Sequence, residues 1–208
     1  MNLEEAKNMQ MDALAEMANI GAGNAATALS HMLNKKIEID VPVPFIGELV
    51  SMERQFVESK DAVVAVFLKV QGDINGAMLN LFTPESALSF VNLLSKKEKK
   101  EISTLNEEDK STLLEVSNIL LGSSLTAISK FLKLNTTHSI PDISTDMLGA
   151  VMDTVFLEMG AESDHVIAFK INLKIEGEKI GGDLFFLFDP KSTDKILEKI
   201  KIKLNVQE

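Results

Sequence analysis

The 208-residue chain contains no cysteine, tryptophan or tyrosine, and its only aromatic residues are eleven phenylalanines. Without cysteine it can form no disulfide, no thiolate metal site and no cysteine nucleophile, and nothing favours an oxidising compartment. Without tryptophan or tyrosine, a surface that stacks nucleic-acid bases is not expected. These absences exclude several common binding and catalytic chemistries.

Basic residues are also outnumbered by acidic ones. The chain has 21 lysines and arginines against 31 aspartates and glutamates, a net charge of −10. It is therefore repelled by phosphate backbones and by anionic lipid, so neither nucleic acid nor a membrane is an expected partner. No basic leader precedes an apolar run, and no segment approaches the roughly 18 continuous apolar residues of a membrane span. We expect a cytoplasmic protein.

The hydrophobic content of 45% is enough for a buried core. Periodicity and turn residues predict a helix over residues 4–33, strands over residues 37–41, 63–70 and 77–82, and a helix over residues 84–94. Residues 95–109 are charged and read as a connector. The second half predicts a helix over residues 107–133, a proline-containing passage, a helical or irregular segment, strands over residues 166–177 and 182–189, and a closing helix.

The two halves share one order of elements, and each hairpin leads into a capped helix. Thr83-Pro84 and Asp189-Pro190 both place an N-cap residue before a proline at the first helical position. We predict an α+β fold in which an internally duplicated, antiparallel sheet is covered by helices with pseudo-twofold symmetry. Residues 1–208 would form a single domain of two repeats, about residues 1–95 and 107–208.

The first predicted helix carries a narrow polar stripe. At 100° per residue, an arc of about 60° contains Asp12, Glu16, Asn19 and Gly23. The opposite side is apolar or small, with Leu14, Met17, Gly21, Ala25 and Met32. The helix should bury one face and present the stripe on the other.

The same stripe returns in the second half. Its members are Ser111, Glu115, Asn118 and Gly122. The side that should be buried contains Leu113, Val116, Leu120, Ser124 and Phe131. The Glu-x-x-Asn spacing places a carboxylate and an amide side by side on one helix face, about 5 to 6 Å apart at Cβ.

More familiar catalytic sites are not indicated. The three histidines, His31, His138 and His165, lack the spacing of metal ligands. Gly122-Ser-Ser does not match a nucleophile elbow, and Gly21-Ala-Gly23 lies inside a helix rather than between a strand and a helix. We expect neither a metal nor a cofactor bound by this chain itself.

Asparagine and glycine are costly inside a helix, by some tenths of a kcal/mol and about 1 kcal/mol relative to alanine. A solvated polar face with small residues for helix packing would explain a single Glu-x-x-Asn. Its recurrence in register, each time with glycine four residues after the asparagine, favours a docking site on another protein. There the amide can orient a water molecule and the carboxylate can pair with a cation.

The segments containing Glu16-Met-Ala-Asn19 and Glu115-Val-Ser-Asn118 resemble the paired signature of the CheC family of chemotaxis phosphatases. The resemblance implies dephosphorylation of the response regulator CheY. Asn19 and Asn118 would orient the hydrolytic water beside the regulator's aspartyl phosphate, and Glu16 and Glu115 would pair with its active-site lysine. The magnesium ion would belong to the regulator.

The family also implies a second partner, the deamidase CheD. The segment around Asp146 and Met147 loosely resembles the docking region for CheD, and Asp12 and Ser111 fit the family spacing at the stripes. The alternative for this segment, which begins at Ile140, is a capped helix whose apolar face, Met147, Val151 and Val155, packs on the sheet.

The alternative to an enzyme is a catalytically silent protein that binds CheY-phosphate or CheD. A monomer is expected, because both signatures occupy one chain rather than two copies of a CheX-type dimer. Flagellar-switch phosphatases with an additional motor domain are disfavoured, because the chain ends soon after its predicted closing helix.

Overall fold

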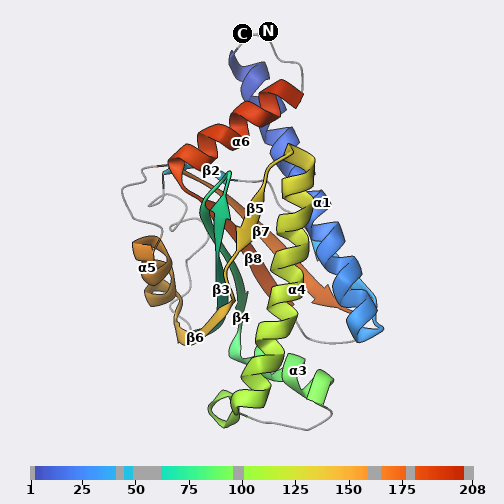
Figure 1. The fold of residues 1–208 in the computed structure, drawn as a ribbon. Helices are drawn as coiled ribbons and strands as arrows, with labels where there is room; N and C mark the ends of the chain where they lie inside the picture. The colour runs from blue at the N-terminus through green and yellow to red at the C-terminus, as the bar shows by residue number, and fades with distance from the viewer. Residues whose placement is uncertain are drawn as a thin grey trace.

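The computed structural model describes residues 3–40, 45–48, 62–95, 101–158, 165–176 and 181–203 (Figure 1). The helices are α1 (Leu3–Leu33), α3 (Pro84–Ser95), α4 (Glu107–Leu132), α5 (Leu148–Glu158) and α6 (Pro190–Lys203), with a short 3₁₀ turn, η1 (Ile102–Thr104). The strands are β1 (Ile37–Asp40), β2 (Phe45–Glu48), β3 (Ala62–Gly72), β4 (Gly76–Phe82), β5 (Thr136–His138), β6 (Asp142–Met147), β7 (His165–Ile175) and β8 (Gly181–Phe188). The α+β prediction is confirmed.

The described strands form one antiparallel sheet in the order β1-β7-β8-β4-β3-β5, with β2 also on β7 and β6 also on β3. Hairpins β3-β4 and β7-β8 meet at the centre, where Leu79 pairs with Phe185. The predicted antiparallel sheet of two hairpins is therefore present.

The edges of the sheet interlock the two parts of the chain. Strands β1 and β2 lie one after the other along β7, so that Ile37 pairs with Ile175 and Glu48 with His165. Strands β5 and β6 lie in the same way along β3. Each hairpin is thus flanked by strands from the other half of the chain. The division into two repeats stays a prediction.

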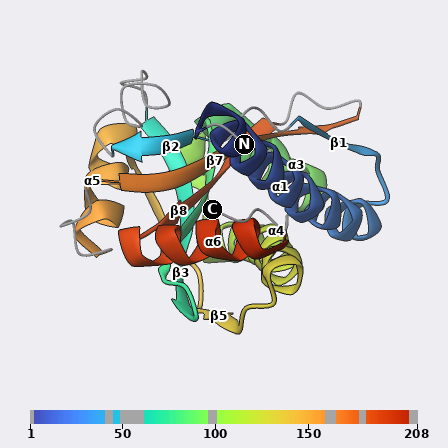
Figure 2. The same cartoon turned by 90° about the horizontal axis from the view of Figure 1, so that it is seen from above.

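The sheet carries helices on both faces (Figure 2). One face packs against α1, α3, α4 and α6, through a core that includes Leu68, Met78 and Phe186. The other face packs against α5, where Leu79 and Phe185 meet Val151, Met152 and Val155. Successive strand residues alternate between the two cores, because side chains of a strand point to opposite faces.

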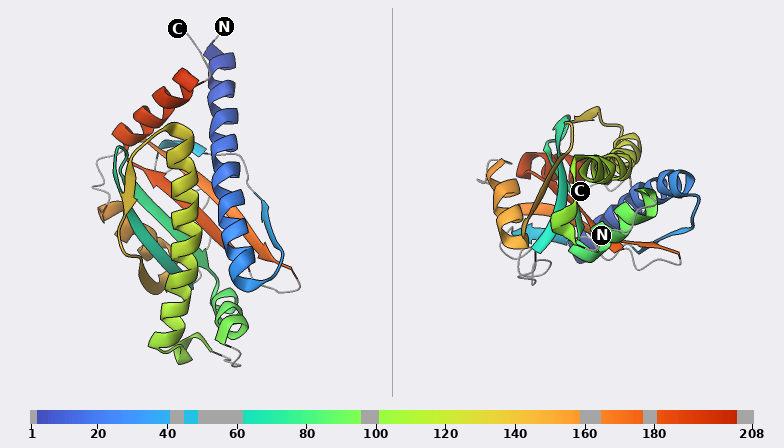
Figure 3. Two further views of the ribbon diagram at one scale, coloured as in Figure 1. Left: turned by 45° about the vertical axis from the view of Figure 1, so that its right-hand side comes forward. Right: turned by 90° about the horizontal axis from the view of Figure 1, so that it is seen from below.

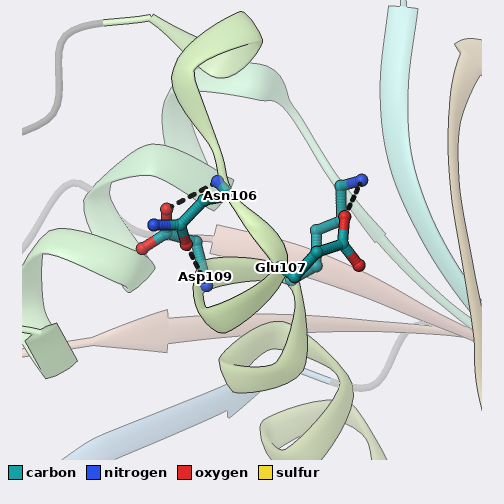
Figure 4. A network of polar contacts seen from close by, with 4 residues as sticks. Asn106, Glu107 and Asp109 are labelled. Atoms are coloured by element: carbon teal, nitrogen blue, oxygen red, sulfur yellow. Dashed lines mark hydrogen bonds and ion pairs between the residues drawn. The ribbon is translucent and has the colours of Figure 1, made fainter.

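The predicted helix caps are present. The hydroxyl of Thr83 accepts a hydrogen bond from the Ser86 amide at 3.1 Å, and the carboxylate of Asp189 accepts one from the Ser192 amide at 2.7 Å. Helix α4 begins with a capping box that was not predicted. Asn106 and Asp109 each accept a bond from the other's backbone amide, at 3.0 and 2.8 Å (Figure 4). The end of the predicted connector is therefore a helix start, and residues 96–100 lie outside the described residues.

The passage after α4 differs from the prediction. Residues 142–147 form edge strand β6 rather than the start of a helix, and α5 begins at Leu148. Met147 is 47% exposed, whereas Val151 and Val155 are buried on the sheet as expected. Strands β2 and β5 were also missed. These short strands lie at the sheet edges, and the side chains of β5 and β6 are largely exposed, so they lack the apolar alternation that identifies a half-buried strand.

Within the described part of the chain, α4 is the one helix long and apolar enough to cross a membrane by length and composition, and half of that window is buried inside the protein. Its buried residues include Leu113, Val116, Leu120 and Leu125. Because these side chains pack into the core on α1 and the sheet, α4 is a central helix of this fold.

A polar contact ties the turn between β3 and β4 to distant elements. The Asp73 carboxylate pairs with Lys195 of α6 at 2.7 Å and accepts a hydrogen bond from the Asn135 amide at 2.7 Å. The Lys195 ammonium, and then the Asn135 amide, hold the pKa of Asp73 below its ordinary value. The ionised carboxylate therefore stabilises the folded state.

We expect Asp73→Asn to lower the unfolding midpoint at neutral pH. Because the pKa of Asp73 is depressed in the folded state, the loss of stability in Asp73→Asn should persist at pH values above the unfolded-state pKa of about 3.9. This loss should shrink as the pH falls further. Thermal unfolding of both proteins from pH 7 to pH 3 measures this, with the exposed neighbour Asp194→Asn as control. A deficit that stays constant down to pH 3 contradicts the assignment.

Candidate functional site

Helix α1 presents its polar stripe to solvent. The side chains of Asp12, Glu16 and Asn19 are exposed, and Gly23 is exposed with them. The opposite face is buried, with Leu14, Met17, Ala25 and Leu29 at 0% exposure. The burial of apolar residues at helical spacing therefore sets the rotation of α1 that turns the stripe outward.

Helix α4 presents the second stripe in the same way. Ser111, Glu115 and Asn118 are exposed, and Gly122 is half-buried. Val116 and Ser117, between the glutamate and the asparagine, face the core. The structure therefore places each Glu-x-x-Asn pair on one exposed helix face. The catalytic roles of these four residues stay predictions.

The two helices pack side by side on the same face of the sheet (Figure 3). At their contact, Ser124 Oγ donates a hydrogen bond to the Gly21 carbonyl at 3.2 Å, in a buried setting. A Cβ on Gly21 would lie 3.5 Å from the Ser124 carbonyl oxygen and 3.6 Å from Ile128 Cγ1. Gly21 therefore belongs to the helix contact, whereas the stripes lie on other faces.

The two stripe glycines have different surroundings. A Cβ at Gly23 would meet no other atom within 4 Å, so packing does not explain that glycine. A Cβ at Gly122 would lie 3.3 Å from His138 Nε2 of β5. The imidazole of His138 therefore lies over the last turn of the second stripe. Sequence reasoning missed this contact because it judged the histidines only by their spacing as metal ligands.

A buried hydrogen bond lies beneath the second stripe. Asn80 Nδ2 donates to Ser117 Oγ at 2.9 Å, and both side chains are buried. Ser117 directly precedes Asn118, so this bond connects the helix to strand β4 where the stripe residues project outward. Asn80 lies inside an otherwise apolar strand, and its partner could not be read from sequence spacing.

In the described part of the chain neither stripe forms a metal-ligand cluster, although His31 and His138 line the hollow beside Asn118. Within the described residues no three His, Asp or Glu side chains come together as metal ligands. His31 and His138 are exposed, and the side chain of His165 lies outside the described residues. An exposed carboxylate beside an exposed amide can hold a cation and a water molecule of a docked partner, but it offers no nucleophile of its own.

The weaker partner-binding candidates are divided between regions. Asp12 and Ser111 lie one turn before Glu16 and Glu115 on the two stripes. Asp146 and Met147 lie instead at the end of edge strand β6, where the Asp146 carboxylate accepts a hydrogen bond from the Met147 amide at 2.7 Å. The structure thus places these two on a different element from either stripe.

Comparisons with known proteins agree on one family. Residues 9–46, which contain the first stripe, match the model of the CheC-like family. The CheY-P phosphatase CheC of Bacillus subtilis is 34% identical over 197 residues, covering 91% of this chain and 93% of the relative.

Solved structures share the fold. Thermotoga maritima FliY superposes with a TM-score of 0.73 at 20% identity, covering 98% of both chains. The CheX–CheY–BeF₃–Mg complex from Borrelia burgdorferi matches with a TM-score of 0.53 at 17% identity, over 82% of this chain and 96% of the other. On the extent and identity of the match to the Bacillus relative, the chain belongs to the CheC-like family.

Proposed function

We propose that the protein is a phosphatase that hydrolyses the aspartyl phosphate of a CheY-type chemotaxis response regulator. The observation that carries the proposal is the pair of exposed Glu-x-x-Asn stripes on α1 and α4 in a member of the CheC-like family. A relative with 34% identity is named a CheY-P phosphatase, and a protein of the same fold is named in a complex with CheY.

In this mechanism most of the active centre comes from the regulator. The regulator supplies the phosphorylated aspartate and the magnesium ion, and Glu16 or Glu115 pairs with its active-site lysine. The amide of Asn19 or Asn118 then orients a water molecule in line with the bond between phosphorus and the aspartate oxygen. Water attacks phosphorus, the aspartate carboxylate leaves, and phosphate is released. Positioning of the attacking water can supply a large share of the acceleration of such a reaction.

The chain is also proposed to act as a monomeric, cytoplasmic, single domain of two repeats. The repeats are supported by the interlocked edge strands and by the matching ends of α1 and α4. Both helices are followed by a left-handed residue, Asn34 with φ of 50° and Lys133 with φ of 54°. A chain that holds both stripes needs no second copy to complete a pair of sites.

A deamidase of the CheD type is a proposed second partner. Its docking region would include the end of β6 and helix α5, where Met147 is 47% and Leu157 75% exposed. Exposed large apolar side chains of this kind often mark contacts with other proteins. Asp146 would add a charged contact beside them.

The rival function, a silent binding protein for the regulator or CheD, has the same surfaces but no turnover. Release of phosphate from the phosphorylated regulator should be accelerated by amounts of this protein far below stoichiometric. Time courses at molar ratios from about 1:100 to 1:1 measure this. An effect that appears only near equal amounts would identify binding without catalysis.

A further inference from the structure

The second stripe continues into a surface with positive charge. A shallow hollow between α1 and α4 is lined by Asn118, Thr126 and His138 on one side, and by α1 residues that include Gly23 and His31 on the other. An adjoining hollow shares Thr126 and His138 and continues to Lys130 and Lys133 near the end of α4. The residues that line the two hollows include no aspartate or glutamate, although the whole chain has a net charge of −10. We call Lys130, Lys133 and His138 the basic end of the second stripe.

The three side chains are available to a partner. Lys130 and Lys133 are exposed, and neither has an ion-pair partner in the described ranges. The His138 Nδ1 lies 2.9 Å from the Ser139 carbonyl oxygen, so this nitrogen donates its proton there. The opposite ring nitrogen, Nε2, therefore faces Gly122, one helical turn after Asn118.

Lysines near a helix C-terminus often only offset the negative end of the helix dipole. That explanation suits Lys130, which lies in the last turn of α4. It does not account for His138, which comes from strand β5 and closes over the stripe itself. Two elements thus contribute positive or protonatable groups to one surface.

The first stripe also has basic residues near its end, but at other positions: His31 takes the place of Lys130, and Lys35 and Lys36 follow. Ile39 lies as far after Asn19 as His138 lies after Asn118, and Asn34 takes the place of Lys133. The nearby strand β1 contributes two exposed acids, Glu38 and Asp40, and Glu38 pairs with Lys36 at 3.0 Å. The positions of the basic groups, and the acids beside them, therefore differ between two stripes that share the same Glu-x-x-Asn.

We propose that the basic end extends the docking surface of the second stripe and contacts an acidic face of the phosphorylated regulator. This rests on the proposed function. The ligand is anionic at its phosphoryl group, and rim charges of opposite sign raise association rate and affinity without taking part in chemistry. The second site therefore binds the regulator with a steeper dependence on salt than the first.

Variants that keep only one of the two asparagines test the proposal. In Asn19→Ala, where only the second site is intact, the change Lys130→Gln with Lys133→Gln should raise KM about fivefold and leave kcat unchanged, because each exposed ion pair contributes only modestly to binding. In Asn118→Ala the same change should have no effect. The matched control is Lys174→Gln with Lys191→Gln, two exposed lysines elsewhere. Equal effects in both backgrounds would overturn the proposal.

Binding provides a readout that does not depend on turnover. The variant that lacks both Asn19 and Asn118 is titrated with a CheY-type regulator that carries beryllium fluoride and Mg²⁺, at 50 and 300 mM NaCl. Adding the two lysine changes should weaken binding at low salt about fivefold and flatten the salt dependence. Unchanged affinity would contradict the proposed role of the basic end, even if hydrolysis is confirmed. Failure of the proposed function would give a different result: the variant that lacks both Asn19 and Asn118 would hydrolyse the phosphorylated regulator at an unchanged rate.

Discussion

Replacing both Asn19 and Asn118 with alanine should return the phosphorylated regulator to its own slow rate of decay. Each amide projects from an exposed helix face and has no part in the buried core, so the fold should survive the change. Loss of the group that orients the attacking water should lower the accelerated rate about a hundredfold or more. Phosphate release at low molar ratio measures the effect.

The comparison needs evidence that the variant is folded. Thermal unfolding should give a midpoint close to that of the unchanged protein, since surface substitutions usually alter stability by about 0.5 kcal/mol or less. Asn75→Ala, at an exposed asparagine in the turn before β4, serves as the matched control for activity. A folded double variant that still accelerates decay would exclude the proposed role of the asparagines. The two single variants then report how much each stripe contributes.

Gly76→Ala should strongly destabilise the whole protein. Gly76 pairs with Phe188 where the two central hairpins meet. A Cβ there would overlap the Leu187 carbonyl oxygen and lie 3.0 Å from Phe188 Cα, and both obstacles are backbone. The central strands must then move apart, which we expect to cost about 2–4 kcal/mol. Urea unfolding measures the loss as a lower midpoint.

A second glycine provides the control. Gly149 lies near the start of α5, and a Cβ there would meet no atom within 4 Å. Gly149→Ala should therefore raise stability by about 0.5–1 kcal/mol, because alanine is the better helix former and restricts the unfolded chain. If Gly76→Ala and Gly149→Ala unfold at the same urea concentration, close approach of the central strands does not explain Gly76.

Local signals made much of the fold predictable. The buried faces of α1 and α4 follow from apolar residues at helical spacing, and the starts of α3 and α6 follow from Thr83 and Asp189 before proline. Strands β3 and β4 could be predicted from the sequence because they are buried over most of their length. The residues that determine each of these elements lie within the element or a few residues from it.

The missed features depend on partners far away in the chain. Strand β6 is held by main-chain pairing with β3 and offers little apolar pattern of its own. The Asn80–Ser117 hydrogen bond and the position of His138 over Gly122 exist only once β4, α4 and β5 are packed together. For the candidate site, the exposed residues of the stripes could be predicted, whereas the groups beneath and beside the second stripe could not.

The interlocked edges of the sheet also bear on how the protein folds during synthesis. Strands β1 and β2 are made early but find their partner, β7, only after most of the chain has been made. The β3-β4 hairpin can pair with β5 and β6 somewhat earlier, but its central neighbour β8 is made only after β7. Open strand edges pair readily with other chains, and pairings between distant segments form slowly. The interlocked sheet therefore leaves the nascent protein exposed to aggregation until its last strand has formed.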